Sequence, residues 1–230
     1  MRFDIITTFP KIFDSYFGES ILKRAQKSGK IEIQAHDLRI YTNDKHKKTD
    51  DTPYGGGAGM VFMAEPLLKA VEDVKKELGM RNNVKSKVVV LSAKGKQFNQ
   101  KMAYDWAKKY SQIIFVSGRY EGIDERVRTI LKADEISIGP YVLTDGDVAA
   151  MVVISAVARL IPGVINFESL EEESFWNKTL KKELNQAEHE YPHYTRPEVL
   201  EWKGKKYRVP KVLMSGNHKK IAEWRKEKSK

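Results

Sequence analysis

Residues 118–127 read Gly-Arg-Tyr-Glu-Gly-Ile-Asp-Glu-Arg-Val, and this stretch decides the fold class. The apolar run before it, residues 113–116, is short and β-branched, which predicts a buried strand. The residues after it, 127–131, favour a helix. A strand that leads through a glycine turn into a helix forms a ligand crevice at the carboxyl end of the strand. A second loop of the same kind follows at residues 137–147, so we expect a small molecule held mainly by backbone groups.

Strand-like and helical segments alternate through the first two thirds of the chain. The pattern predicts strands at 5–9, 31–35, 88–91 and 113–116, and helices at about 12–25, 64–78, 100–109 and 127–131. Continuous apolar strands between helices predict an α/β fold, with a parallel sheet covered by helices on both faces. Residues 146–160 are apolar nearly all round if helical, so this helix should be buried on all sides, in the core or against another subunit.

The character of the sequence changes after Pro162-Gly163, where an acidic stretch without a sheet pattern begins. We therefore predict a first domain at 1–165, an interdomain linker at 166–178 and a small, mostly α-helical domain at 179–230. Within the last domain, residues 181–190 and 219–228 are the helix candidates.

The composition is that of a soluble globular protein, with 41% hydrophobic and 31% charged residues. The chain has no cysteine, which excludes disulfides, thiolate metal sites and cysteine nucleophiles and fits a reducing cytoplasm. Asp4 comes too early for a secretory signal. The longest apolar stretch, 148–161, is too short to span a bilayer. We therefore expect a cytoplasmic protein that does not cross a membrane.

The net charge is +10, and most of the excess lies at the end of the chain. Residues 203–230 hold eleven lysines and arginines against Glu223 and Glu227. Such a segment is typical of proteins that bind a phosphate backbone. The alternative is a solvated tail, but the interleaved aromatic residues Trp202 and Trp224 favour RNA.

Six motifs together carry a resemblance to a known family. They are, in chain order, Asp51–Met60, the two loops quoted above, Arg159–Gly163, His193–Leu200 and Ser215–His218. In these motifs the chain resembles the bacterial tRNA (guanine-N1)-methyltransferases, which are knotted S-adenosylmethionine enzymes of the SPOUT class. The resemblance runs nearly end to end. It implies methylation of N1 of guanosine 37 in tRNA, a deep trefoil knot in the first domain, and a homodimer whose active sites are each built from both subunits.

The resemblance also implies a binding site for S-adenosylmethionine made of three loops. Its residues would be Leu91, Ser92, Ala93, Gly118, Tyr120, Glu121, Gly122, Ser137, Ile138, Gly139, Tyr141, Leu143 and Gly146. The chain lacks both the dinucleotide fingerprint and the phosphate-binding P-loop pattern, so a ligand without phosphates fits better. The alternative is that these glycines only form tight turns.

Methylation of guanine N1 requires a base, because N1 carries a proton, and a cation near O6, where negative charge develops. The resemblance assigns Glu173 as the base, although the family has an aspartate there. It assigns Arg159 as the cation. The alternative for Arg159 is a favourable interaction with a helix C-terminus. The alternative for Glu173 is helix capping around Ser169 and Glu172, and Glu171 and Glu172 are possible substitute bases.

Other positions differ from the family or complete the site. Asp145 and Ala149 stand where the family has glycine and proline. The positions matched to tRNA binding are Asp50, His193, Arg196, Ser215 and His218, supported by Lys45, His46, Lys47 and Lys48. The five histidines show no zinc-ligand spacing, whereas the resemblance suggests that Glu121 helps to bind Mg²⁺.

Two other functions stay open from the sequence. The first is an RNA-binding relative that has lost catalysis, suggested by Glu173 and Asp145. The second is a knotted methyltransferase with a different RNA target.

Overall fold

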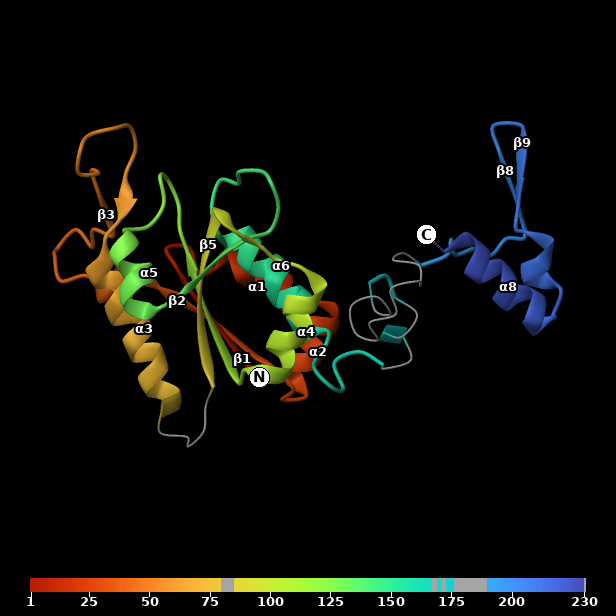
Figure 1. Cartoon of the computed structure of the whole chain (residues 1–230), viewed down its shortest axis with the longest axis horizontal. Helices are drawn as coiled ribbons and strands as arrows, with labels where there is room; N and C mark the ends of the chain where they lie inside the picture. Colours follow the sequence, from red (N-terminus) through yellow and green to blue (C-terminus); the bar gives the residue numbers. More distant parts are fainter. Residues whose placement is uncertain (80–84, 167–168, 171–172, 176–189, 230) are drawn as a thin grey trace. The chain divides into compact units, whose positions relative to one another are not determined.

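The computed structural model describes residues 1–79, 85–166, 169–170, 173–175 and 190–229. The chain divides into two compact units, Met1–Ile165 and Asn166–Lys230, and we describe each by itself. Figure 1 shows both units with their helices and strands.

The first unit is built on a five-stranded sheet in which every neighbouring pair is parallel, in the order β2-β1-β6-β5-β7. The strands are β1 (Arg2–Thr7), β2 (Glu32–Asp37), β5 (Ser86–Gln97), β6 (Gln112–Ser117) and β7 (Asp134–Ser137). Every residue of the central strand β6 is buried. This burial explains its continuous apolar sequence, and the prediction of a parallel sheet is confirmed.

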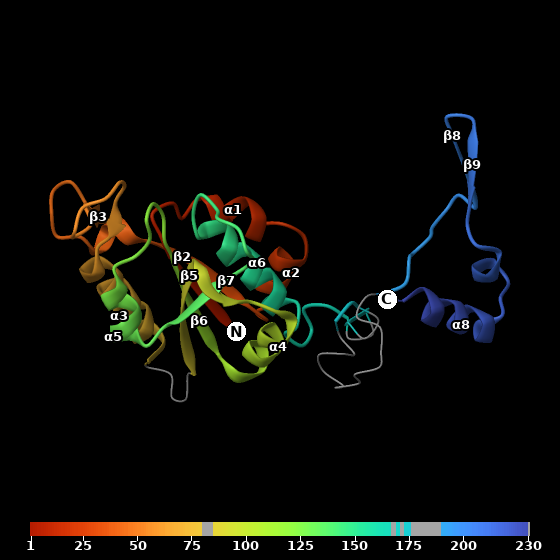
Figure 2. The ribbon, with the colours of Figure 1, turned by 45° about the horizontal axis from the view of Figure 1, so that its top comes forward.

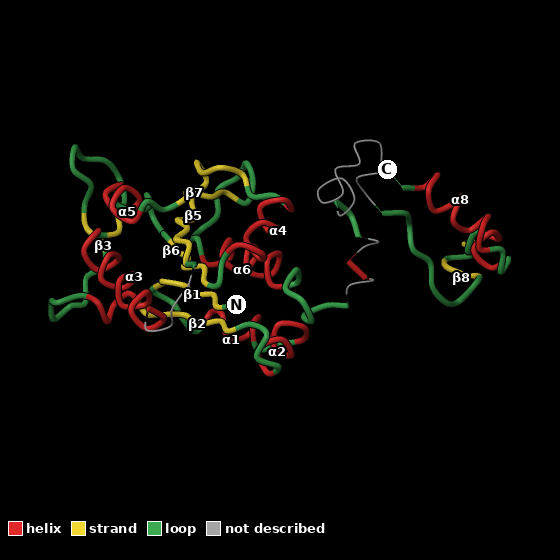
Figure 3. Tube along the Cα trace, turned by 60° about the horizontal axis from the view of Figure 1, so that its bottom comes forward, coloured by secondary structure: helices red, strands yellow, loops and turns green. Residues whose placement is uncertain are grey.

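Helices cover both faces of this sheet (Figures 1 and 3). One face carries α3 (Ala64–Gly79) and α5 (Glu125–Leu131). The other face carries α1 (Ile12–Phe17), α2 (Ser20–Lys27), α4 (Gln100–Lys109) and α6 (Asp147–Ala158). Alternate residues of β6 enter the two separate cores, with Ile113 and Phe115 in one and Ile114 and Val116 in the other.

The helix predicted at 12–25 is wrong, because the chain forms two helices there. Helix α1 ends at Phe17, and the Gly18 N–H donates to the Asp14 carbonyl oxygen at 2.9 Å. A Cβ at position 18 would lie 2.5 Å from that oxygen, so the close turn requires glycine. Ser20 then opens α2 at φ +50, a left-handed conformation that breaks the helical path.

All four predicted strands differ somewhat in their bounds, and two of them differ most. The first begins at Arg2 and ends at Thr7, before the predicted end at residue 9. The strand predicted at 88–91 extends to Gln97, with a register shift in its pairing with β7 between Leu91 and Lys96. Both Leu91 and Lys96 pair with Ile136, so residues 92–95 leave the ladder as a bulge.

Helix α6 is not buried on all sides within this chain, so burial in the core alone does not account for its apolar sequence. Ala150, Val153 and Ile154 are fully buried in the core. Val148 and Val152, one turn apart, are each 44% exposed. An exposed apolar stripe on a core helix is unfavourable in water, and burial against another subunit stays a prediction.

Short elements complete the first unit. The 3-10 helix η1 (Leu38–Tyr41) follows β2. Strands β3 (Asp50–Asp51) and β4 (Val61–Phe62) pair in antiparallel fashion and close the glycine-rich loop between them. The sequence analysis did not predict this small sheet.

The second unit contains a β-hairpin that the sequence analysis also missed. Strands β8 (Val199–Trp202) and β9 (Lys205–Arg208) are joined by Lys203 and Gly204, which both have positive φ, as tight hairpin turns require (Figure 2). The strands are largely exposed and charged, so they lack the apolar alternation that reveals a strand.

Beyond the hairpin lie η3 (Lys211–Met214) and α8 (His218–Lys228), where a helix is predicted from 219 to 228. The helix predicted at 181–190 lies outside the described residues, except for its last position. Across the described parts of both units, none of the helices combines the length and the apolar character needed to cross a membrane.

Candidate active site

Three loops meet at the carboxyl edge of the sheet, because parallel strands end on the same side. They are the bulge in β5, the loop between β6 and α5, and the loop between β7 and α6. In Figure 1 the second and third of these rise from the upper edge of the sheet. They surround a cavity of about 390 Å³, a volume typical of small-molecule sites.

The structure brings the predicted S-adenosylmethionine residues together at this cavity. It is lined by Leu91, Ser92, Ala93, Gly118, Tyr120, Glu121, Gly122, Ser137, Ile138, Tyr141, Leu143 and Gly146. Gly139 is the predicted residue that does not line it. A Cβ at Gly139 would lie 2.3 Å from the Tyr141 ring, so this glycine lets the ring pack against the loop backbone.

The second and third loops are joined directly through their backbones. The Gly146 N–H donates to the Gly118 carbonyl oxygen at 2.9 Å. A Cβ at Gly146 would lie 3.1 Å from the Ser117 Cα and 3.2 Å from the Gly118 nitrogen. Glycine at this position therefore permits the close approach that sets the width of the cavity.

A buried ion cluster that the sequence analysis missed holds these two loops against the sheet. The Asp147 side chain is fully buried, and its Oδ1 accepts hydrogen bonds from Thr7 Oγ1 at 2.8 Å and Ser117 Oγ at 2.6 Å. Arg119 Nη2 donates to Asp147 Oδ2 at 3.2 Å and to Asp145 Oδ2 at 3.0 Å. Asp147 also opens α6, where the helix dipole favours a negative charge.

Asp145 and Arg119 have further contacts that fix their side chains. Asp145 Oδ1 accepts a hydrogen bond from the Asp147 N–H at 2.9 Å, which caps the start of α6. The Arg119 guanidinium lies 4.3 Å from the centre of the Phe9 ring. Among the described residues, Arg119 Nε has no hydrogen-bond partner, so the guanidinium is held mainly through Nη2.

The cavity carries negative charge although the protein is strongly basic. Its charged lining consists of Glu121, Asp124, Glu125, Glu135 and Asp145 against Lys94, Arg119 and Arg128. This leaves a formal excess of two negative charges, whereas the whole chain has a net charge of +10. An acidic wall disfavours phosphates and favours a small ligand that carries positive charge.

Neighbouring arginines keep two of these carboxylates ionised. Hydrogen bonds from Arg126 hold the pKa of Asp124 below its usual value. Hydrogen bonding from Arg128 lowers the pKa of Glu125 in the same way. Both carboxylates are therefore charged at neutral pH, and each is paired with an arginine.

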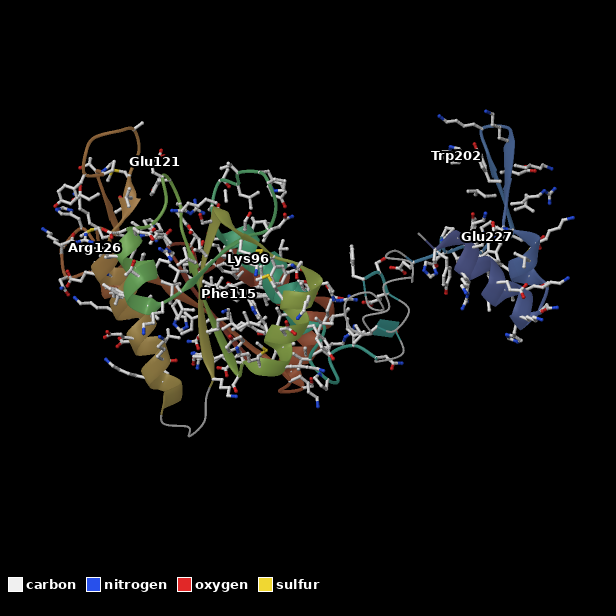
Figure 4. The ribbon with its side chains drawn as sticks, in the orientation of Figure 1. Lys96, Phe115, Glu121, Arg126, Trp202 and Glu227 are labelled. Carbon is white, nitrogen blue, oxygen red and sulfur yellow. The ribbon has the colours of Figure 1, made fainter. Side chains whose placement is uncertain are left out.

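The glycine-rich loop 52–60 reaches the rim of the cavity next to Glu121. The Glu121 N–H donates to the Met60 carbonyl oxygen at 3.1 Å. A Cβ at Gly59, where φ is +81, would lie 2.5 Å from Glu121 Oε1. Figure 4 shows Glu121 in the loop after β6, at the same edge of the unit as this glycine-rich loop.

Glu121 was also the residue expected to help bind Mg²⁺. Within the described part of the chain, no group of three or more histidine, aspartate or glutamate side chains is arranged to hold a metal ion. The structure therefore adds nothing in favour of a metal at Glu121.

Neither of the two predicted catalytic residues belongs to the cavity lining. Arg159 directly follows α6, whose 12 residues make it about 18 Å long, so Arg159 lies one helix length from the cavity. Glu173 belongs to the second unit, and its N–H donates to the Leu170 carbonyl oxygen at 3.3 Å. The substitute bases Glu171 and Glu172 lie outside the described residues. The proposed capping pair of Ser169 and Glu172 includes one of them, so it also falls outside the described residues.

The residues predicted to bind RNA are divided between the two units. In the first unit, Asp50 lies in β3, which follows a basic loop. The carboxylate of Asp44 fixes the shape of this loop, because it accepts hydrogen bonds from the N–H groups of His46 and Lys48. Lys45 and Lys47 belong to the same loop, and Lys47 has a φ of +52.

In the second unit, the predicted RNA-binding residues lie in and around the segment before α8. His193 Nε2 lies 3.0 Å from Glu190 Oε2, and this hydrogen bond lowers the pKa of Glu190. Arg196 lies between this pair and the hairpin. Ser215 Oγ donates to the Val212 carbonyl oxygen at 2.7 Å, and His218 is the first residue of α8.

The fold and the cavity define an α/β protein with an acidic cavity at the carboxyl edge of a parallel sheet and a basic segment at residues 203–230. Comparison with known proteins gives the family. A family model described as "tRNA (Guanine-1)-methyltransferase TrmD" matches residues 1–230. The chain belongs to this family.

Individual relatives are similar along their length. The chain is 51% identical to a tRNA (guanine-N(1)-)-methyltransferase of Thermomicrobium roseum, over 98% of this chain and 78% of the relative. It is 49% identical to that of Clostridioides difficile, over 100% of this chain and 92% of the relative. It is 50% identical to that of Carboxydothermus hydrogenoformans, over 100% of this chain and 83% of the relative.

Proposed function

We propose that this protein transfers a methyl group from S-adenosylmethionine to N1 of guanosine 37 in tRNA. The observation that carries the proposal is the acidic cavity at the carboxyl edge of the sheet, in a chain whose relatives are named for methylation of guanine N1 in tRNA. The donor is a small molecule without phosphates whose sulfonium is positively charged, and this charge suits the acidic wall.

The three cavity loops would hold the donor mainly through backbone groups. The first is the bulge that begins at Leu91, the second runs from Gly118 to Gly122, and the third runs from Ser137 to Gly146. Tyr120 and Tyr141 border the cavity with exposed rings that offer apolar surface to an adenine or a methylene chain. When bound, the donor supplies an electrophilic methyl group.

The acceptor needs a base and a cation, and we assign both to residues outside the cavity lining. Guanine N1 forms a bond to the methyl carbon while the carbon–sulfur bond breaks, and that electron pair stays on sulfur. We assign the N1 proton to the Glu173 carboxylate. We assign stabilisation of the negative charge that develops on O6 to the Arg159 guanidinium. The Glu173 side chain is one methylene longer than the aspartate of the family and keeps the same acid–base chemistry.

A homodimer would bring Arg159 to a cavity. Val148, Val152 and Ser155 share one face of α6 at helical spacing, and Tyr16 donates a hydrogen bond to Ser155 Oγ beside them. If two α6 helices pack antiparallel through this stripe, the end of one helix lies beside the start of the other. The partner's Arg159 would then approach the cavity that begins at Gly146.

The dimer is tested by measuring mass in solution. The Val152→Glu variant should be monomeric and inactive, because a charge in the stripe is costly to bury. A stable monomer with normal activity would contradict this part of the proposal.

The second unit would bind the tRNA. Residues 203–230 carry the basic excess, and the hairpin residues Trp202 and Tyr207 have exposed fractions of 62% and 55%. Figure 4 shows Trp202 on the hairpin. Exposed rings beside cations suit stacking on unpaired bases and contact with phosphates. Asp50, His193, Arg196, Ser215 and His218 are the positions that we assign to tRNA contact.

The proposed fold and location follow the same family. We propose that the first unit, residues 1–165, is threaded into a deep trefoil knot through the loops that line the cavity. A cytoplasmic location fits the absence of cysteine and the tRNA substrate.

The function is tested with labelled S-adenosylmethionine and tRNA transcripts that differ at positions 36 and 37. Methyl incorporation should require guanosine at both positions, and mass spectrometry of the digested product should map the methyl group to N1 of guanosine 37. A methyl group at another nucleotide would indicate a different RNA target. Donor binding without any incorporation would indicate an RNA-binding relative that has lost catalysis.

The role of Glu173 is tested with the Glu173→Gln variant. We expect methyl transfer to slow by at least about a hundredfold while tRNA affinity changes little, because the amide cannot accept the proton. Equal losses of transfer and of affinity would indicate helix capping instead. The neighbouring Ser174→Ala is the matched control for disturbance of the segment.

A further inference from the structure

The side chain of Asp145 places an incompletely balanced negative charge at the cavity wall. Its carboxylate is 8% exposed and lies in the loop between β7 and α6. The cation that it contacts is Arg119, at 3.0 Å, and the same Nη2 atom also serves Asp147 at 3.2 Å. One guanidinium therefore faces two carboxylates, and the cluster keeps a net charge of −1.

Neighbouring groups stabilise the negative charge of Asp147 more than that of Asp145. Asp147 is fully buried and has two hydroxyl donors, from Thr7 and Ser117, as well as the positive end of the α6 dipole. Asp145 receives one side-chain hydroxyl, from Thr144 at 3.2 Å, and one backbone N–H. Of the two residues, Asp145 is the one that lines the cavity. The uncompensated charge is therefore felt by a ligand mainly through Asp145.

We propose that Asp145 is a specificity-determining residue that makes the cavity favour the methyl donor over the spent product. This inference rests on the proposed function. The donor carries a positively charged sulfonium. After transfer, sulfur keeps the electron pair of the broken bond and becomes a neutral thioether in S-adenosylhomocysteine. A nearby negative charge stabilises the first ligand and has little effect on the second, so it assists donor binding without retaining the product.

The size of the effect follows from Coulomb's law. For a unit charge about 8 Å from the sulfonium, in surroundings with an effective dielectric constant of about 40, the expected preference is about sixfold. Shape, hydrogen bonds and apolar contacts are shared by the two ligands. Their contribution therefore cancels in the ratio of the two dissociation constants, and the charge contribution remains.

The test is calorimetric titration of the full-length protein with S-adenosylmethionine, S-adenosylhomocysteine and sinefungin, which carries an amine in place of the sulfonium. For Asp145→Asn, we expect the ratio of the product Kd to the donor Kd to fall about sixfold. The affinity of this variant for sinefungin should fall together with its affinity for S-adenosylmethionine, because both ligands are positively charged. Asp145→Glu keeps the charge and should keep most of the wild-type ratio. Asp105→Asn, which removes an exposed acid that is not part of the cavity lining, should leave the ratio unchanged.

Each outcome is decisive because the ratio is measured within one preparation. A variant that is partly unfolded loses binding sites for both ligands equally, so its ratio is not affected. An unchanged ratio in Asp145→Asn, or an equal fall in Asp145→Glu, would overturn the inference and leave the proposed function intact. Failure of the wild-type protein to bind either nucleoside would instead overturn the proposed function.

Discussion

Replacing Asp147 with alanine should destabilise the first unit more than any exposed substitution. The carboxylate joins three elements, because it accepts hydrogen bonds from Thr7 at the end of β1 and Ser117 at the end of β6, and it opens α6. It is fully buried and is also one of the two carboxylates that pair with Arg119. The change therefore removes one member of a buried charge pair and the shared acceptor of two buried hydroxyls.

The magnitude can be estimated from these contacts. Removing one partner of a buried ion pair typically costs about 3–5 kcal/mol. Loss of the acceptor for the two buried hydroxyls should not raise the total cost above this range, because the energies of neighbouring groups do not add. Arg119 also keeps Asp145 as a partner, which limits the cost. Proteins of this size lose about 2–4 °C in Tm for each kcal/mol. We therefore expect a fall of about 6–20 °C in the Tm of Asp147→Ala.

Thermal unfolding followed by circular dichroism measures this shift directly. The matched control is Asp105→Ala in α4, which removes an exposed pair with Lys101 and should lower the free energy of unfolding by less than about 0.5 kcal/mol. If Asp147→Ala and Asp105→Ala had the same Tm, the buried cluster would not stabilise the fold, and our account of how the cavity loops are held would be wrong.

Two further predictions follow from other contacts. Gly95→Ala would place a Cβ 2.5 Å from the backbone nitrogen of Ile136, so β5 and β7 must separate. We expect the free energy of unfolding, measured by urea denaturation, to fall by about 1–3 kcal/mol. Donor binding, measured by calorimetry, should also weaken. The hydrogen bond from His193 lowers the pKa of Glu190, so the stability from this pair is complete above the usual glutamate pKa and is lost as pH falls through the lowered value. His193→Ala should raise the Glu190 pKa towards its usual value in an NMR titration, and an unchanged pKa would exclude this cause.

The sequence predicted the parts of the fold that depend on local pattern. The apolar run Ile113–Val116 identified the central strand, because only a strand covered on both faces lacks polar alternation. The bounds of α4 agree with the prediction, since the N-cap residue Asn99 accepts a hydrogen bond from the Met102 N–H and the apolar face has helical spacing. The glycines of the two central loops identified the position of the cavity.

Other features depend on contacts between distant residues and were not predictable. Arg119 and Asp147 are 28 positions apart, and their pairing exists because β6 and α6 meet at one edge of the sheet. The break before α2 depends on a left-handed residue, Ser20, that has no sequence signal. The hairpin at Lys203-Gly204 has a turn signal but exposed, charged strands, so the pattern of its strands gave no indication of a sheet.

Helix α6 has a consequence for how the protein would respond to dilution. This helix begins at the cavity with Asp147, exposes Val148 in its first turn and Val152 near its middle, and is followed directly by Arg159. If that helix also forms the contact between subunits, occupancy of the cavity and association of the subunits are reciprocal by thermodynamic linkage. A saturating donor concentration would then keep the protein dimeric at protein concentrations where the ligand-free dimer dissociates. Dissociation of the dimer would in turn lower the affinity for the donor.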